Sequence, residues 1–127
     1  MEKEEIIDHW LQSAEDNSRI AEDLFKLSHF SWCLFMWHLA IEKVLKAIIV
    51  KLDKEVPYTH DLVKLAQNAE IDLSNDQINE LEEIKSYNLE ARYDDYKQEF
   101  YKKANKDYAS TWSSKCKVLY IWIKTQI

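Results

Sequence analysis

Hydrophobic residues recur every three or four positions along most of the chain, which is the spacing typical of amphipathic helices. Between about residues 3 and 27 they form a single apolar stripe, made of Ile7, Trp10, Leu11, Ala14, Ala21, Leu24 and Phe25. Residues 106–125 carry a similar stripe and a second apolar face, formed by Val118, Ile121 and Trp122. We therefore expect a long helix at each end of the sequence, and the second face of the last helix could contact a partner chain.

The segment from about residue 30 to residue 52 has a different pattern, because its apolar positions surround nearly the whole helix circumference. A helix that is apolar on all sides lies at the centre of a bundle or at an interface. We assign this helix to the bundle centre or to a dimer seam.

Shorter elements are predicted between these helices. Pro57 disfavours helix in the residue before it, and Thr59 is a good N-cap for a third helix over residues 60–69. Ser74 or Asn75 would cap a fourth helix over residues 76–89. Residues 87–97 are the least periodic and predict a loop or irregular turn, followed by a short helix around residues 100–101.

Composition supports an all-α fold. The 127 residues suffice for one domain, over residues 1–127, and they include no glycine and one proline. Without glycine the chain cannot build a P-loop or a Rossmann fingerprint, and hairpin turns are disfavoured. We expect a four- to five-helix, mainly up-and-down bundle, with Ser28 and His29 forming the C-cap region of the first helix.

Charge and cysteine content narrow the classes of partner. The formal net charge of −6 disfavours nucleic-acid binding through the overall field, although a local basic patch remains compatible with it. One modest basic run, residues 97–106, interleaves lysines with aromatic residues, and its acidic neighbours favour a solvated helix face. The two cysteines predict buried, reduced thiols. The acidic N-terminus and the absence of a long apolar run predict a cytoplasmic protein without a membrane segment.

Three charged residues within the apolar central segment are the main candidates for chemistry. Glu42 and Lys46 are four residues apart, with the acid first, which is the favourable order for a helical ion pair. Lys43 lies between them. Two interpretations are equally compatible with the sequence: a solvated stripe, or a polar cleft in which Lys43 and Lys46 face an anion.

Histidine and arginine residues give further candidates. No histidine forms an HExxH pair or a Cys/His cluster, so no metal site and no cofactor are predicted. His38 is expected to be a packed, hydrogen-bonded core residue, and His60 and Asp61 fit the start of a helix. Arg92, beside Tyr93, indicates either a planar contact to a ligand or a structural ion pair.

Three segments together resemble a known family. They are Ala40-Ile41-Glu42-Lys43-Val44-Leu45-Lys46-Ala47, then Thr59-His60-Asp61-Leu62, then Ala91-Arg92-Tyr93. Their order and spacing, across about residues 13–123, resemble the prokaryotic HEPN domain. The resemblance implies a helical bundle that forms homodimers and often pairs with a small nucleotidyltransferase, in toxin–antitoxin or related two-component systems.

Some HEPN proteins are metal-independent ribonucleases, which use an arginine followed four to six residues later by a histidine at the dimer interface. Arg92 is the matching arginine, but the eligible positions hold Lys97, Gln98 and Glu99, and no histidine follows His60. RNA cleavage needs a proton-transfer group that titrates near neutrality, which histidine usually supplies.

We therefore expect a binding module without its own catalysis, which binds a nucleotidyltransferase, a nucleotide, or both. Its expected ligand-binding residues are Glu42, Lys43, Lys46, His60, Asp61, Arg92 and Tyr93. Two alternatives stay open: a ribonuclease that uses Arg92 and His60 on RNA, and a purely structural interaction protein.

Overall fold

The computed structural model describes residues 2–88 and 99–127, and within these ranges all regular secondary structure is helical. The helices are α1 (Lys3–Lys26), α2 (Phe30–Lys51), α3 (Leu62–Asn68), α4 (Asn75–Lys85), α5 (Glu99–Lys103) and α6 (Lys106–Lys124). The predicted all-α bundle is confirmed. The described ranges hold six helices, slightly more than the four to five expected for the bundle, and the two shortest, α3 and α5, have 7 and 5 residues.

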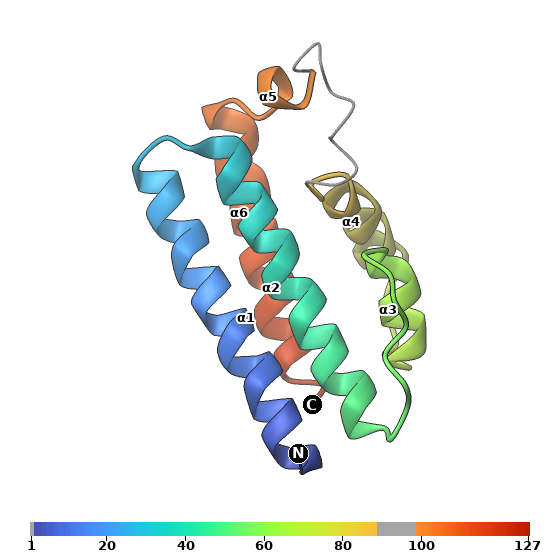
Figure 1. Cartoon of the computed structure of the whole chain (residues 1–127). Coiled ribbons are helices and arrows are strands. Elements are labelled where there is room, and N and C mark those ends of the chain that lie inside the picture. Colours follow the sequence, from blue (N-terminus) through green and yellow to red (C-terminus); the bar gives the residue numbers. More distant parts are fainter. Residues whose placement is uncertain (1, 89–98) are drawn as a thin grey trace.

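Helix α2 is the centre of the bundle, which is one of the two positions that its all-round apolar pattern predicted. Figure 1 shows α1 on one side of α2, α3 and α4 on the other side, and α6 behind it. Most of α2 is buried, including the large side chains of Leu34, Trp37, Ile41, Leu45 and Ile49.

Both cysteines are buried free thiols, on α2 and α6. Within the described ranges, no helix combines the length and the apolar character needed to cross a bilayer.

Three helices end in a left-handed residue, although the chain has no glycine to place there. Ser28, Asp53 and Glu70 have φ values of 63°, 60° and 56° and directly follow the C-caps of α1, α2 and α3. After α1, the His29 N–H donates to the Leu24 carbonyl at 2.9 Å, which closes a Schellman-type turn. Non-glycine residues pay about 1–2 kcal/mol for this conformation. The C-cap region expected at Ser28 and His29 is thus confirmed.

The starts of the two middle helices differ in how well they were predicted. At α4, Ser74 and Gln77 form a reciprocal capping box, in agreement with the expected cap. Helix α3 begins two residues later than predicted, because its N-cap is Asp61, which accepts from the N–H groups of Val63 and Lys64. The Thr59 hydroxyl instead accepts from the Asp61 N–H at 3.1 Å, before the helix starts.

Helix α4 also ends earlier than predicted, at Lys85 rather than near residue 89. Ser86 follows as the C-cap, and its hydroxyl donates to the Glu83 carbonyl at 2.6 Å. Short polar side chains of this kind compete with helix hydrogen bonds and favour helix ends.

Candidate functional site

Glu42 is the centre of a polar cluster in the middle of α2. Its side chain is only 4% exposed, yet each carboxylate oxygen has a partner. Oε2 accepts from the Lys46 ammonium at 2.9 Å, and Oε1 lies 3.0 Å from Nδ1 of His60. A buried charge is tolerated only when it is paired and hydrogen-bonded, and Glu42 meets both conditions.

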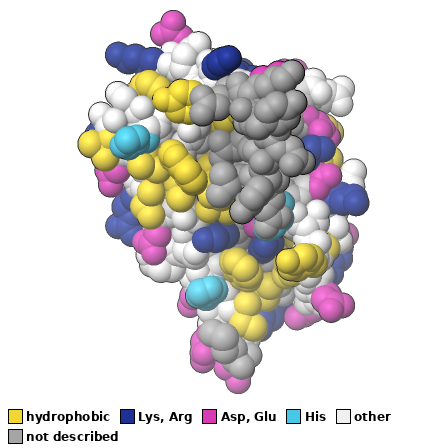
Figure 2. Space-filling model, turned by 45° about the horizontal axis from the view of Figure 1, so that its top comes forward, with side chains coloured by type: hydrophobic (Ala, Val, Ile, Leu, Met, Phe, Trp, Pro, Cys, Tyr) yellow, Lys and Arg dark blue, Asp and Glu magenta, His cyan; other side chains and the backbone are white. Residues whose placement is uncertain are grey.

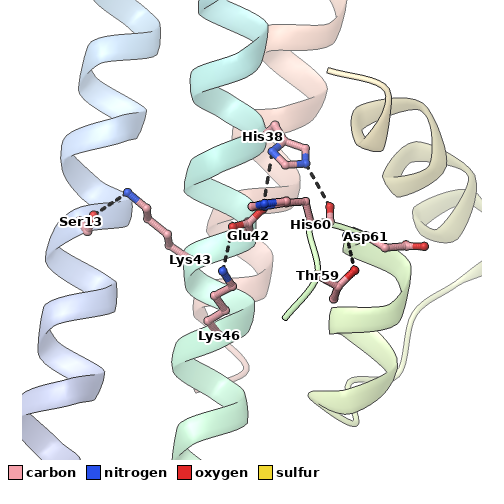
Figure 3. Close-up of polar contacts among 8 residues, drawn as sticks. All are labelled: Ser13, His38, Glu42, Lys43, Lys46, Thr59, His60 and Asp61. Atoms are coloured by element: carbon pink, nitrogen blue, oxygen red, sulfur yellow. Dashed lines mark hydrogen bonds and ion pairs between the residues drawn. The ribbon is translucent and has the colours of Figure 1, made fainter. Parts of the chain in front are cut away.

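The segment before α3 is attached to α2 through two histidines. Nε2 of His38 lies 3.3 Å from the main-chain oxygen of His60, and Nδ1 of His38 lies 3.9 Å from Oε1 of Glu42. A carbonyl oxygen can only accept, so Nε2 of His38 carries the proton at this contact. Figure 3 shows the His60 side chain reaching across to Glu42 while its main chain faces His38. His38 is fully buried, which confirms the packed, hydrogen-bonded role expected for it.

Lys43 points away from this cluster, toward α1. Its ammonium donates to the Ser13 hydroxyl at 2.7 Å, as Figure 3 shows. Burial between the helices lowers the pKa of Lys43, since desolvation disfavours its charged form. The ammonium of Lys46 lies 5.2 Å from the centre of the Trp10 ring, also on α1. This contact has the geometry of a cation–π interaction.

Of the remaining predicted site residues the structure describes Asp61, which makes contacts of its own. The Asp61 side chain caps α3 and lies 3.7 Å from the Lys85 ammonium. Arg92 and Tyr93 lie outside the described residues. The sequence left the partner of Glu42 open, with Lys46 at a favourable spacing, and the structure brings both Lys46 and His60 to it.

Two contacts on α1, those of Trp10 and Ser13, were missed by sequence reasoning. The residues are three positions apart and so share a helix face, which was a usable signal. Which face of α1 meets the lysines of α2 depends on how the helices pack, and the local pattern does not specify this.

The arrangement combines lysine ammonium groups with an imidazole held by a carboxylate. Lysine ammonium groups are common phosphate ligands, and a carboxylate hydrogen-bonded to Nδ1 fixes the orientation of a histidine ring. In the parts of the chain that the structure describes, no group of three or more His, Cys, Asp or Glu residues could hold a metal ion.

The fold and the cluster define a small all-helical domain with a charged centre on its core helix. A family model, the HEPN domain, matches residues 7–126, and the chain therefore belongs to the HEPN family. None of the curated proteins compared with the chain matches it.

Among solved structures, TT1696 from Thermus thermophilus is similar, with a TM-score of 0.79 and 18% sequence identity. The match covers 95% of this chain and 98% of TT1696. At this identity the likeness concerns the fold alone.

Proposed function

We propose that this HEPN domain is a binding module: a homodimer that associates with a small nucleotidyltransferase and binds a nucleotide at the Glu42 cluster, without catalysis of its own. The observation that supports it best is the buried Glu42 carboxylate with its partners Lys46 and His60. Charged groups are costly in the middle of a core helix, and a binding role accounts for that cost.

The partners of Glu42 have the chemistry that a nucleotide needs. The Lys46 side chain is 14% exposed and that of His60 is 40% exposed, so both are within reach of a ligand. Phosphate oxygens would compete with Glu42 for these two groups, and the partly buried Trp10 ring lies beside Lys46. On α6, Val118 and Ile121 are 70% and 52% exposed, which supports a role for that face in pairing with a second chain.

Calorimetry with ATP, ADP and AMP tests the nucleotide part of this proposal. We expect Lys46→Ala and His60→Ala to weaken binding. Lys64→Ala, which removes an exposed lysine of α3, is the matched control and should bind as the wild type does. Helical circular dichroism must be equal for all variants, so that a loss of fold is not mistaken for a loss of binding.

Association is tested by light scattering of the purified chain and by co-purification with the small nucleotidyltransferase encoded nearest to it. A dimer that binds this enzyme supports the proposal. A monomer that binds neither a nucleotide nor the enzyme contradicts it.

A ribonuclease is the second candidate, and the orientation of His60 by Glu42 favours it. The carboxylate lies 3.0 Å from Nδ1, which is how an acidic residue positions a general base. An RNA cleavage assay of the wild type, Arg92→Ala and His60→Ala separates the two candidates. Cleavage that both variants lose supports a nuclease, and absence of cleavage by the wild type eliminates it.

A further inference from the structure

A groove of about 510 Å³ lies at the end of the bundle where the α1–α2 connection meets the α5–α6 connection. Figure 1 shows this end at the top, away from both termini. Trp32 at the start of α2 and Tyr101 on α5 line the groove and are 47% and 67% exposed. Trp32 also makes an edge-on ring contact with Phe35, with 6.1 Å between the ring centres, and a large part of each of the two rings stays open to solvent.

The lysines of this groove differ from the others on the same two helices. Lys103, Lys115, Lys117 and Lys124 each lie within 4.0 Å of a glutamate, at 2.6, 3.9, 3.1 and 3.3 Å respectively. Lys102 and Lys106 both line the groove and are exposed, and neither has a carboxylate at ion-pair distance within the described ranges. The net charge of −6 repels anions overall, so the attraction here is local: two lysines without a nearby carboxylate among the described residues lie beside two exposed rings, which makes this groove complementary to an anion that carries aromatic groups.

Figure 2, tilted so that this end comes forward, shows hydrophobic side chains gathered on the surface, with lysine or arginine side chains close to them. The basic run noted in the sequence contributes only part of the groove. Phe100 is buried and Lys103 is paired with Glu83, whereas Trp32 comes from a segment about seventy residues earlier.

We propose that this groove binds single-stranded nucleic acid, with bases stacked on Trp32 and Tyr101 and the phosphates next to Lys102 and Lys106. Stacking on aromatic side chains combined with backbone neutralisation by lysine is the general mode of single-strand binding. The site is separate from the Glu42 cluster: Trp32 precedes Glu42 by ten residues, about 15 Å along the axis of α2. The inference goes beyond the proposed function and does not depend on it.

Fluorescence anisotropy with labelled ten-nucleotide oligo-U and oligo-dT tests the proposal. We expect Trp32→Ala and Tyr101→Ala each to weaken binding by about 5-fold to 160-fold, which corresponds to the loss of one stacked base. With two phosphates neutralised, the slope of log affinity against log salt should be about −1.4, or roughly a sevenfold loss between about 50 and 200 mM salt. The double variant Lys102→Glu/Lys106→Glu should abolish this dependence of affinity on salt.

Matched controls come from exposed residues elsewhere on the surface. Tyr58→Ala removes a fully exposed ring from the loop between α2 and α3. Lys51→Glu/Lys64→Glu makes the same change in net charge on exposed positions of α2 and α3. Trp32→Phe keeps a ring at the groove and should retain most of the affinity, which separates loss of stacking from loss of fold.

Three results would overturn the proposal. The first is that neither oligonucleotide binds the wild-type chain, and the second is that the groove variants bind as the controls do. The third is that a poly-glutamate peptide binds the groove as tightly as the oligonucleotides, because that would make it a site for acidic protein segments. Nucleotide calorimetry on Lys46→Ala reports the proposed function independently of all three.

Discussion

Replacing Lys46 with methionine should destabilise the fold, because it removes one of the groups that compensate the buried Glu42 carboxylate. Breaking a fully buried ion pair costs about 3–5 kcal/mol. Here the Lys46 side chain is 14% exposed, and His60 still hydrogen-bonds to the carboxylate after the substitution. We therefore expect a smaller loss, about 1–3 kcal/mol, close to that of a single hydrogen bond to a charged group.

A double variant separates the ion pair from simple loss of packing. In Glu42→Gln the new amide group would face the Lys46 ammonium, so this single change should also be destabilising. In Glu42→Gln/Lys46→Met no charge is left unpaired, and the amide oxygen can still accept from His60. The double variant should therefore recover most of the loss, with a coupling energy of about 1–3 kcal/mol between the two positions.

Urea unfolding followed by far-ultraviolet circular dichroism measures these differences. With a slope of about 2 kcal/mol per molar urea, a loss of about 2 kcal/mol lowers the midpoint by about 1 M. Lys51→Met, an exposed position at the end of the same helix, is the control and should stay within about 0.5 kcal/mol of the wild type. The reasoning fails if Lys46→Met unfolds at the midpoint of this control, or if the double variant loses the sum of both single losses.

Four further predictions concern other parts of the fold. Tyr108→Phe should lower the free energy of unfolding by about 1–3 kcal/mol, because the buried Tyr87 hydroxyl, 2.6 Å from that of Tyr108, loses its partner. Tyr87→Phe should lower it less. Thermal unfolding of the two variants measures the difference. Burial raises the pKa of both tyrosines above the ordinary 10.0. The unfolded chain therefore loses these protons first, so stability is retained below pH 10.0 and should fall above it, as urea midpoints at increasing pH will show. Asp61→Ala should cost about 1 kcal/mol in urea unfolding through loss of the α3 N-cap. Burial also raises the pKa of the Cys33 and Cys116 thiols, and a thiol reagent should label them only on unfolding; rapid labelling of the native chain would contradict their burial.

Much of the fold could be predicted from the apolar spacing, because the buried face of a long helix appears in the sequence as apolar residues every three or four positions. A central or interface position for α2 could be predicted for the same reason, because this helix has too few polar positions to form a solvent-exposed face. The start of α3 was not readable, since Thr59 and Asp61 are both good N-cap residues. The structure uses them in series, with the threonine hydroxyl holding the Asp61 N–H and the aspartate capping the helix.

The candidate site was predictable only where it is local. Glu42 and Lys46 are one helical turn apart, so their spacing permits the ion pair that the structure shows. The contact of His60 with Glu42 spans eighteen residues and depends on how the loop between α2 and α3 folds back over α2. The local sequence does not specify how this loop folds.

Three polar contacts of α2 explain how a helix with charged residues can occupy the bundle centre. Lys43 reaches α1, Glu42 reaches the segment before α3, and His38 holds the main chain of the same segment. Each of these polar groups therefore meets its partner where α2 packs against another part of the chain. The sequence left open whether Glu42, Lys43 and Lys46 form a solvated stripe or line one cleft. In the structure Lys43 contacts α1, whereas Glu42 contacts the segment before α3. A ligand that takes Lys46 or His60 must compete with Glu42, so ligand binding and the position of the segment before α3 are energetically coupled.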